Sequence, residues 1–365
     1  MGTLRFLLAL SVIVNHSGAL LFFDIIGGKT AVQTFYIISG FYMSLILNEK
    51  YVGINNSYKL FITNRFIRLF PTYWVILLCT IISAIGVMFI TNFESIPKFD
   101  KYIENNMSIL SLAYMIFTNI FIFGQDIVMF LGLNTETGSL FFTEKFAMTN
   151  PPLHTFLMIP QAWTVGLELT FYLIAPFMLK KGIKNVLILI TLVFTLRMFL
   201  YNYFDFSFDP WTFRFLPTEL IFFLFGYLSY YFYTKIRTKE FSKSSKLIVY
   251  IAMIIFTLFY NAIPEINIPY FPFKLKESLY FAFIVSSIPI LFIFLKKTKW
   301  DIVVGELSYP IYLSHMLIIM VCHGLPFSFL QSSIMITIIT VIFSFGINYF
   351  IENPIDKYRQ KRIKQ

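Results

Sequence analysis

Long apolar runs constrain this chain more than any other feature of its sequence. A helical span needs roughly 20 predominantly apolar residues, and inside hydrocarbon each span must satisfy its own backbone hydrogen bonds, which favours helices. Eleven segments qualify as candidates: 4–23, 33–48, 69–92, 108–124, 162–180, 183–200, 213–233, 246–262, 277–295, 301–323 and 329–350. The sequence therefore predicts an all-α, polytopic integral membrane protein whose first segment is a retained helix.

The composition also indicates that the chain is embedded in membrane lipid. Of the 365 residues, 58% are hydrophobic and 13% are charged, whereas soluble domains have about 45–50% apolar and about 25% charged residues. The net charge of +10 lies mainly in short loops between apolar runs. This is the Lys and Arg excess of cytoplasmic loops, so nucleic acid is not an expected partner. Cys79 and Cys322 lie in apolar segments, and no Cys/His spacing suggests a metal site.

Five basic clusters predict the topology. If all are cytoplasmic, an even number of crossings separates consecutive clusters. The stretch from Arg68 to Lys180 holds three candidates, so we predict that 108–124 is re-entrant or lies at the outer surface. Ten crossings with both termini cytoplasmic result, whereas a third crossing there would invert everything downstream. The clusters are Lys50, Lys59, Arg65 and Arg68; Lys180, Lys181 and Lys184; Lys235, Arg237, Lys239, Lys243 and Lys246; Lys296, Lys297 and Lys299; and Lys357, Arg359, Lys361, Arg362 and Lys364.

One membrane domain, 1–355, accounts for nearly the whole chain, and 356–365 form a basic cytoplasmic tail. The longest external stretch contains 125–160, which is rich in Gly, Asn and Thr. Long loops without secondary structure are often functional, and a disordered external loop is an equal alternative.

Two ionisable residues share one face of the first helix. Arg5 and His16 are eleven residues apart, which places them about 16 Å apart along the axis and within about 20° of the same direction. We expect Arg5 at the inner end and His16 near or slightly beyond the midplane, where an ionisable residue indicates function. The alternative is a histidine that hydrogen-bonds a neighbouring helix.

Two further sets of charged residues adjoin apolar helices. Arg65 and Arg68 are three residues apart, hence neighbours on a helix, at the cytoplasmic mouth of the third segment. Paired guanidinium groups suit phosphate, and an anchor for lipid headgroups is the alternative. Glu168 lies inside an apolar helix, where a carboxylate must be neutral or paired. It either orients a histidine or carries a proton, or it pairs with an arginine such as Arg197 or Arg214.

The order of these motifs resembles the acyltransferase-3 family of integral membrane acyltransferases. The resemblance covers residues 4 to 354 and rests on six segments in order. These are Arg5 with His16, Gly27 to Phe41, the double-arginine stretch from Asn64 to Trp74, Trp163 to Tyr172 with Glu168, Leu307 to His315, and Glu352 to Pro354.

The resemblance implies an enzyme of the bacterial cytoplasmic membrane that moves an acyl group, often acetyl, from cytoplasmic acyl-CoA to an outer hydroxyl. O-antigen, capsule and other cell-surface glycans are acceptors in the family. Acyl-CoA would be a donor substrate, with no permanently bound cofactor. Some members carry a fused outer esterase-like domain, which this sequence lacks. It would therefore complete transfer alone or hand the group to a separate extracytoplasmic transferase.

In that scheme Arg5, Arg65 and Arg68 bind the donor, and His16 acts as a general base or accepts the acyl group as a nucleophile. Glu168 is expected to fix the histidine tautomer. Four residues are candidates for the channel or substrate lining: Ser39, Tyr73, Trp163 and His315.

Other polar residues are interpreted differently. His315 has helix–helix bonding as its alternative, while Glu352 before Pro354 suggests a helix end. His154 and His323 lie in or beside predicted outer loops and are not expected to have a site role. Near the outer ends of their helices, three charged residues pair with each other or contact the acceptor: Arg197, Arg214 and Glu219.

The competing function is a glycan or lipid transporter or exporter without covalent chemistry. Intramembrane charges would fit a carrier. Against it, no repeated half and no matched pair of broken helices is visible in the sequence.

Overall fold

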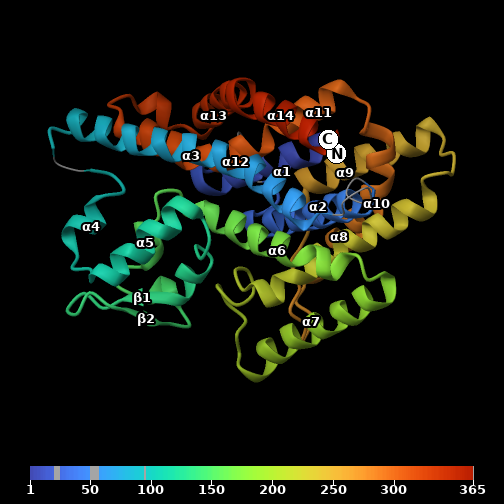
Figure 1. Cartoon of the computed structure of the whole chain (residues 1–365), viewed down its shortest axis with the longest axis horizontal. Coiled ribbons are helices and arrows are strands. Elements are labelled where there is room, and N and C mark those ends of the chain that lie inside the picture. The colour runs from blue at the N-terminus through green and yellow to red at the C-terminus, as the bar shows by residue number, and fades with distance from the viewer. Residues whose placement is uncertain (20–24, 50–56, 94–95, 365) are drawn as a thin grey trace. The chain divides into compact units, whose positions relative to one another are not determined.

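The computed structural model describes residues 1–19, 25–49, 57–93 and 96–364, and these are mostly helical (Figure 1). They form two compact units. The first comprises Met1–Ile62, Tyr172–Ser207 and Leu216–Tyr309, and the second comprises Thr63–Phe171, Phe208–Phe215 and Pro310–Gln365. The all-α fold predicted from the apolar runs is confirmed.

The first unit is organised around α2, which is buried along most of its length and packs against α1, α8 and α10. A Cβ atom at Gly40 would lie 2.0 Å from the Phe223 carbonyl oxygen, and one at Gly226 would lie 2.2 Å from that of Ile37. Small residues therefore bring the backbones of α2 and α8 into direct contact, as in other membrane helix pairs. The helices are α1 (Gly2–Ser17), α2 (Gly28–Glu49), α7 (Ile183–Tyr203), α8 (Leu216–Ile236), α9 (Lys243–Leu258), α10 (Leu275–Leu295) and α11 (Lys299–Glu306), with the start of α3 (Tyr58–Ile90) and the later part of α6 (Trp163–Leu179).

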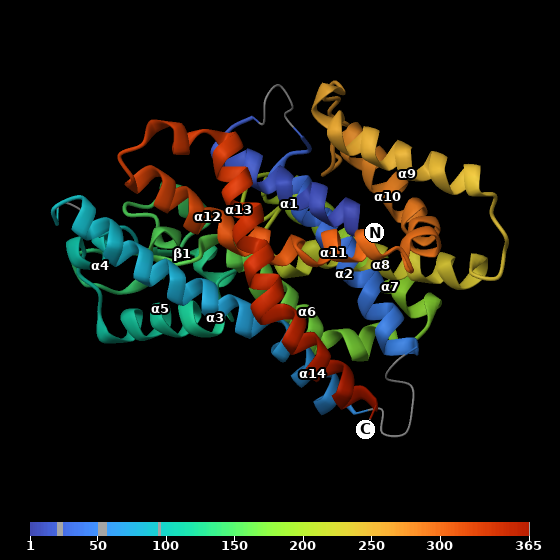
Figure 2. The ribbon, with the colours of Figure 1, turned by 90° about the horizontal axis from the view of Figure 1, so that it is seen from above.

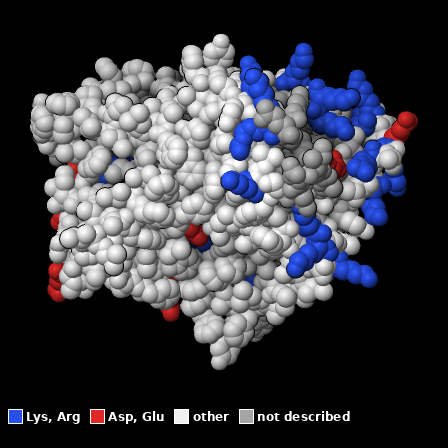
Figure 3. Space-filling view, viewed as in Figure 1, with Lys and Arg blue, Asp and Glu red and all other residues white. Residues whose placement is uncertain are grey.

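Basic residues of the first unit gather at one end. Figure 3 shows Lys and Arg side chains over the ends of α8 and α10 and the start of α9, on the right of the view. These elements carry the third and fourth predicted clusters, and Lys235, Arg237, Lys243, Lys296 and Lys297 are all exposed. Two clusters far apart in sequence thus share one end, as a common cytoplasmic side requires.

The second unit contains most of α3, the start of α6 and three later helices. Between α3 and α6 lie short elements that were expected to be irregular. The stretch 125–160 contains a small antiparallel hairpin, with Leu131 opposite Phe142 and Leu133 opposite Leu140. The elements are α4 (Asp100–Glu104), α5 (Ile109–Phe121), the 3₁₀ turns Ile127–Phe130, Phe146–Met148, Leu153–Phe156, Pro160–Ala162 and Ser328–Gln331, β1 (Leu131–Leu133), β2 (Leu140–Phe142), α12 (Ser308–Gly324), α13 (Ser333–Ile347), a π-helical turn (Asn348–Glu352) and α14 (Asn353–Lys364).

The last helix does not end where the sequence suggested. Glu352 before Pro354 was expected to mark a helix end, but the chain passes through the π-helical turn into α14, drawn in red in Figure 2. Proline cannot donate a hydrogen bond to the preceding turn, and a π turn accommodates this locally. The basic stretch after 355 therefore continues as a helix to Lys364.

Seven helical stretches within the described residues are long and apolar enough to cross a membrane. The other expected crossings coincide with α1, α8 and α9. Both α1 and α9 have 16 residues, or about 24 Å at 1.5 Å per residue. The polytopic character is confirmed, and the count of ten stays a prediction. The seven are Gly28–Glu49, Tyr58–Ile90, Pro160–Leu179, Ile183–Tyr203, Leu275–Leu295, Lys299–Gly324 and Ser333–Arg362.

Candidate functional site

Helix α1 carries Arg5 and His16 on one uninterrupted α-helix. Arg5 is half-buried, and His16 is exposed in the last turn. The helix ends at Ser17 because Gly18 adopts a φ of 94°, a backbone conformation that glycine enters without steric cost. The expected span to residue 23 was therefore too long, and its last residues, 20–23, lie outside the described residues. His16 stands at the C-terminal end of α1, whereas its depth in the bilayer stays a prediction.

Ser39 lies on α2 and faces α6. It is 8% exposed, and its hydroxyl is 3.2 Å from that of Tyr172. Two of the quoted motif segments, Gly27 to Phe41 and Trp163 to Tyr172, thus meet through a polar pair inside an apolar unit. Each hydroxyl can donate to the other, so the contact satisfies both groups where water is scarce.

Helix α3 carries Arg65 and Arg68 in its interior, because it begins at Tyr58, well before the apolar run. Arg65 is 3% exposed and Arg68 is half-buried. Guanidinium groups remain protonated under all ordinary conditions. Arg65 therefore places a positive charge at a buried position. The two arginines are one turn apart on the same helix, as predicted.

Tyr73 and the neighbouring Trp74 support the C-terminal end of α5. Tyr73 is fully buried, and its hydroxyl donates to the Asn119 carbonyl. The Trp74 indole N–H donates to the Ile120 carbonyl over 2.9 Å, and Gln125 donates to the carbonyl of Thr118 over 3.0 Å. The last carbonyls of a helix have no partner within it, so Tyr73 and Trp74 satisfy those of Asn119 and Ile120, while Gln125 adds a second donor to that of Thr118. A place for Tyr73 in the channel lining stays a prediction.

The start of α6 is held by α12. The Gln161 amide donates to the Leu313 carbonyl over 2.7 Å. The Tyr312 hydroxyl donates to the Gln161 carbonyl over 3.0 Å and accepts from the Thr164 hydroxyl over 2.8 Å. This network fixes the turn before Glu168, which is half-buried on α6. Both Glu168 and Arg214 lie within electrostatic reach of Tyr312.

His315 is fully buried on α12, and its Nδ1 lies 2.7 Å from the Tyr312 carbonyl oxygen. A carbonyl only accepts hydrogen bonds. In the neutral ring, Nδ1 therefore carries the proton and Nε2 is the basic nitrogen. Tyr312 thus lies at the junction of α6 and α12. It belongs to the motif from Leu307 to His315, but no signal in the sequence marked it as a candidate.

Trp163 packs in an aromatic and cationic cluster of the second unit. Arg214 lies 4.3 Å from the centre of the Trp163 ring, and Phe213 meets that ring edge-on at 4.9 Å. Arg214 also pairs with Asp209 over 2.8 Å. Nearby, His154 packs edge-on against Phe146, and burial lowers its pKa, with the charge of Arg214 adding to the effect.

The charged residues that were expected at outer helix ends form two ion pairs. Arg197 and Glu219 form an ion pair at 2.9 Å, and Gln33 also donates to Glu219. The expected pairing of Arg197 with Glu219 is confirmed, whereas Arg214 pairs with Asp209. No group of three or more His, Cys, Asp or Glu residues with metal-binding geometry exists in the described part of the chain.

Two expected groupings join residues of different units: His16 with Glu168, and Arg5 with Arg65 and Arg68. Both stay predictions, as do the roles assigned to these residues.

A family model described as an acyltransferase domain matches residues 2–352. Comparison with curated proteins and comparison with solved structures each give no match. The chain belongs to the acyltransferase-3 family and is a membrane acyltransferase.

Proposed function

We propose that this acyltransferase moves an acyl group, with acetyl as the expected one, from cytoplasmic acyl-CoA to a hydroxyl of an extracytoplasmic glycan. O-antigen, capsule or another envelope polysaccharide would be the acceptor, and the bacterial cytoplasmic membrane the location. The observation that carries this proposal is the family match over residues 2–352. The pairing of Arg5 and His16 on one continuous helix supports it.

Donor binding falls to Arg5, Arg65 and Arg68. Acyl-CoA is anionic through its phosphates, and guanidinium groups bind phosphate through paired, charge-assisted hydrogen bonds. Arg5 and His16 are about 16 Å apart along α1. That separation suits a donor whose phosphates and thioester lie at opposite ends of a long, extended arm.

His16 supplies the proton chemistry. As a base, it takes the proton of the acceptor hydroxyl while the oxygen attacks the thioester carbonyl. A C–O bond then forms, the C–S bond breaks, and the CoA thiolate leaves and is protonated. As a nucleophile, the imidazole would first take the acyl group itself. Glu168 would hold the histidine tautomer in either case.

The acceptor side is assigned to residues deeper in the helices. Ser39, Tyr73, Trp163 and His315 are the expected lining residues of the substrate path, and the first two contribute hydroxyl groups. Transfer would be completed by this chain or passed to a separate extracytoplasmic transferase. Both termini would be cytoplasmic.

The test is acyl transfer from labelled acyl-CoA in membrane vesicles that contain the protein. We expect His16→Ala to abolish label transfer at unchanged protein level, and His323→Ala, an exposed histidine at the end of α12, to leave it intact. Label that stays on the wild-type protein without acceptor would identify the nucleophilic route. Normal transfer by His16→Ala would overturn the mechanism, and glycan movement without thioester consumption would favour a transporter.

A further inference from the structure

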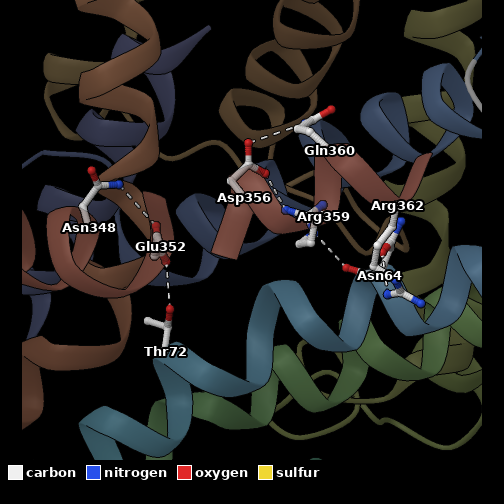
Figure 4. Close-up of polar contacts among 8 residues, drawn as sticks. All are labelled: Asn64, Thr72, Asn348, Glu352, Asp356, Arg359, Gln360 and Arg362. Carbon is white, nitrogen blue, oxygen red and sulfur yellow. Dashed lines mark hydrogen bonds and ion pairs between the residues drawn. The ribbon is translucent and has the colours of Figure 1, made fainter. Parts of the chain in front are cut away.

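The C-terminal helix α14 makes specific polar contacts with α3 (Figure 4). The Arg359 Nε donates to the Asn64 carbonyl oxygen over 3.0 Å. Arg362 donates to the Asn64 side-chain oxygen over 2.8 Å and to the Thr63 hydroxyl over 3.0 Å. Thus two consecutive turns of α14 bind one turn of α3.

A second contact lies further along α3. The Thr72 hydroxyl donates to the Glu352 carboxylate over 3.2 Å, and Asn348 of the π-helical turn donates to the other oxygen of that carboxylate over 3.4 Å. Asn353 in turn donates to the Asn348 side chain over 3.0 Å. The segment Glu352 to Pro354, which the sequence marked as a motif, therefore anchors the junction between α13 and α14 onto α3.

These contacts bracket the double arginine. Asn64 directly precedes Arg65, and Thr72 lies one turn beyond Arg68. In an α-helix the carbonyl of Asn64 also accepts the backbone N–H of Arg68, four residues later. The carbonyl bound by Arg359 is thus part of the turn that carries both Arg65 and Arg68.

The hydrogen bond between Arg359 and Asn64 is shielded from water because both residues are buried. Asn64 is fully buried, and Arg359 is 6% exposed. The guanidinium of Arg359 is oriented from behind by Asp356, which it contacts at 2.7 Å. Its planar fork therefore holds two partners at once, a geometry that lysine does not reproduce. By contrast, Lys357 and Lys361 lie exposed on the same helix.

We propose that α14 is a clamp that positions the arginine-bearing turn of α3 for the acyl donor, with Arg359 and Arg362 as positioning residues. The inference rests on the proposed function for the identity of the donor. The clamp itself rests on the contacts between α14 and α3. It assigns the basic tail a role beyond setting topology, because Arg359 and Arg362 hold α3 while Lys357 and Lys361 lie exposed.

The first measurement is independent of catalysis. Hydrogen exchange of the full chain in lipid nanodiscs is compared for wild type, Arg359→Ala and the matched control Lys361→Ala. We expect faster exchange of the peptide covering residues 60–70 in Arg359→Ala and wild-type exchange in Lys361→Ala. Unchanged exchange in Arg359→Ala overturns the clamp, whatever the activity.

The second measurement concerns the donor. With acyl-CoA as substrate, we expect Arg359→Ala and Arg362→Ala to raise KM roughly tenfold, as loss of a hydrogen bond to a charged group allows, with kcat changed less than about twofold. Arg359→Lys, which keeps the charge without the fork, should resemble Arg359→Ala.

Three further outcomes contradict the proposal. An equal rise of KM in Lys361→Ala, or a wild-type KM in Arg359→Lys, would show that bulk charge is what matters. Faster exchange in α3 with unchanged KM would show a clamp that does not serve the donor. If the wild-type protein neither binds CoA nor consumes acyl-CoA, the proposed function fails while the exchange comparison still decides the clamp.

Discussion

Arg197 and Glu219 form an ion pair in which the side chains are 2% and 0% exposed. A buried ion pair gains little over apolar residues of the same size, but breaking it is costly because one charge loses its counter-charge. Gln33 adds an amide donor to the same carboxylate, so three helices, α2, α7 and α8, are tied together at one point.

We expect Glu219→Ala to destabilise the protein by about 3–5 kcal/mol, since Arg197 would keep its buried charge without the carboxylate. The double variant Arg197→Met with Glu219→Leu should recover most of this loss. The measurement is thermal unfolding of the purified protein in detergent, followed by tryptophan fluorescence. A Glu219→Ala protein as stable as wild type would show that the pair contributes nothing.

At the level of single residues, the sequence identified which polar side chains were unusual but only partly how they pair. Charges within apolar runs are conspicuous because lipid makes them costly. Which side chains pair depends on how each helix is rotated about its axis and on the path of the loops. The pair of Arg197 and Glu219 was therefore one of several pairs that the sequence allowed. Arg214 was assigned to the same group, yet a short local loop gives it Asp209, five residues earlier. Tyr312 and Asn64 carry no charge and gave no such signal.

Helix α5 has its polar residues inward and its apolar residues outward. Ser111, Thr118 and Asn119 are buried, while the large exposed side chains are all apolar: Ile109, Leu110, Leu112, Ile116, Phe117, Ile120 and Phe121. This inversion is expected for a helix that faces lipid. With 13 residues, α5 is about 20 Å long at 1.5 Å per residue, too short for a hydrocarbon core of about 30 Å.

The chain also returns to the start of α5. The Ser111 hydroxyl donates to the Gly138 carbonyl over 2.7 Å, and the Asn106 amide donates to the Glu136 carbonyl over 3.3 Å. Between these points the turn after α5 reaches α3, where Phe123 meets Phe66 edge-on at 6.0 Å. A path that leaves and returns to one place favours the re-entrant form of the prediction for 108–124.

We expect single cysteines at positions 106 and 136 to be labelled from the same, outer side by a membrane-impermeant maleimide. The two positions are hydrogen-bonded, so they lie on the same side and an odd number of crossings between them is excluded. Labelling is measured in intact cells, with Cys79 and Cys322 first replaced by serine. Lys239→Cys, in a loop expected to be cytoplasmic, is the control that should react only after permeabilisation. Reaction of positions 106 and 136 from opposite sides would refute the re-entrant path.

Most long helices were recognisable from the sequence because a span of apolar residues has few alternatives in lipid. The elements between α3 and α6 were not. Strands β1 and β2 have three residues each, too short to show an alternating pattern. Their turn depends on Gly138, whose φ is +69°, a local requirement that composition alone does not reveal.

Across the whole chain, the distribution of basic residues is the feature that connects sequence to orientation. The parity argument needs only that basic clusters share one side, and it does not depend on helix packing. The topology could therefore be predicted from the sequence. The two compact units could not, because each is built from segments that alternate along the chain. Contacts within a unit join residues that are far apart in the sequence, as with Thr63 and Arg362. A local sequence pattern does not predict such contacts.

The topology makes a prediction that tests orientation and mechanism together. Cysteines introduced singly at Lys59, Lys181, Lys239, Lys297 and Lys357 represent the five basic clusters, and all should react with an impermeant maleimide only in inverted vesicles or permeabilised cells. The physical reason is that Lys and Arg near short loops are retained on the cytoplasmic side. Position 136 serves as the outer control in the same cysteine-free background.

Because the donor is expected from the cytosol, Lys59→Cys is the decisive position, since it lies on α3 two turns before Arg65 and Arg68. Reaction of this position from outside in intact cells would separate the double arginine from the acyl-CoA pool and remove the basis for donor binding. Reaction of the downstream positions alone from outside would indicate an odd number of crossings between Arg68 and Lys180. In that case the inner and outer ends of every later helix would exchange, which would conflict with the hydrogen bonds that join α14 to the first turns of α3.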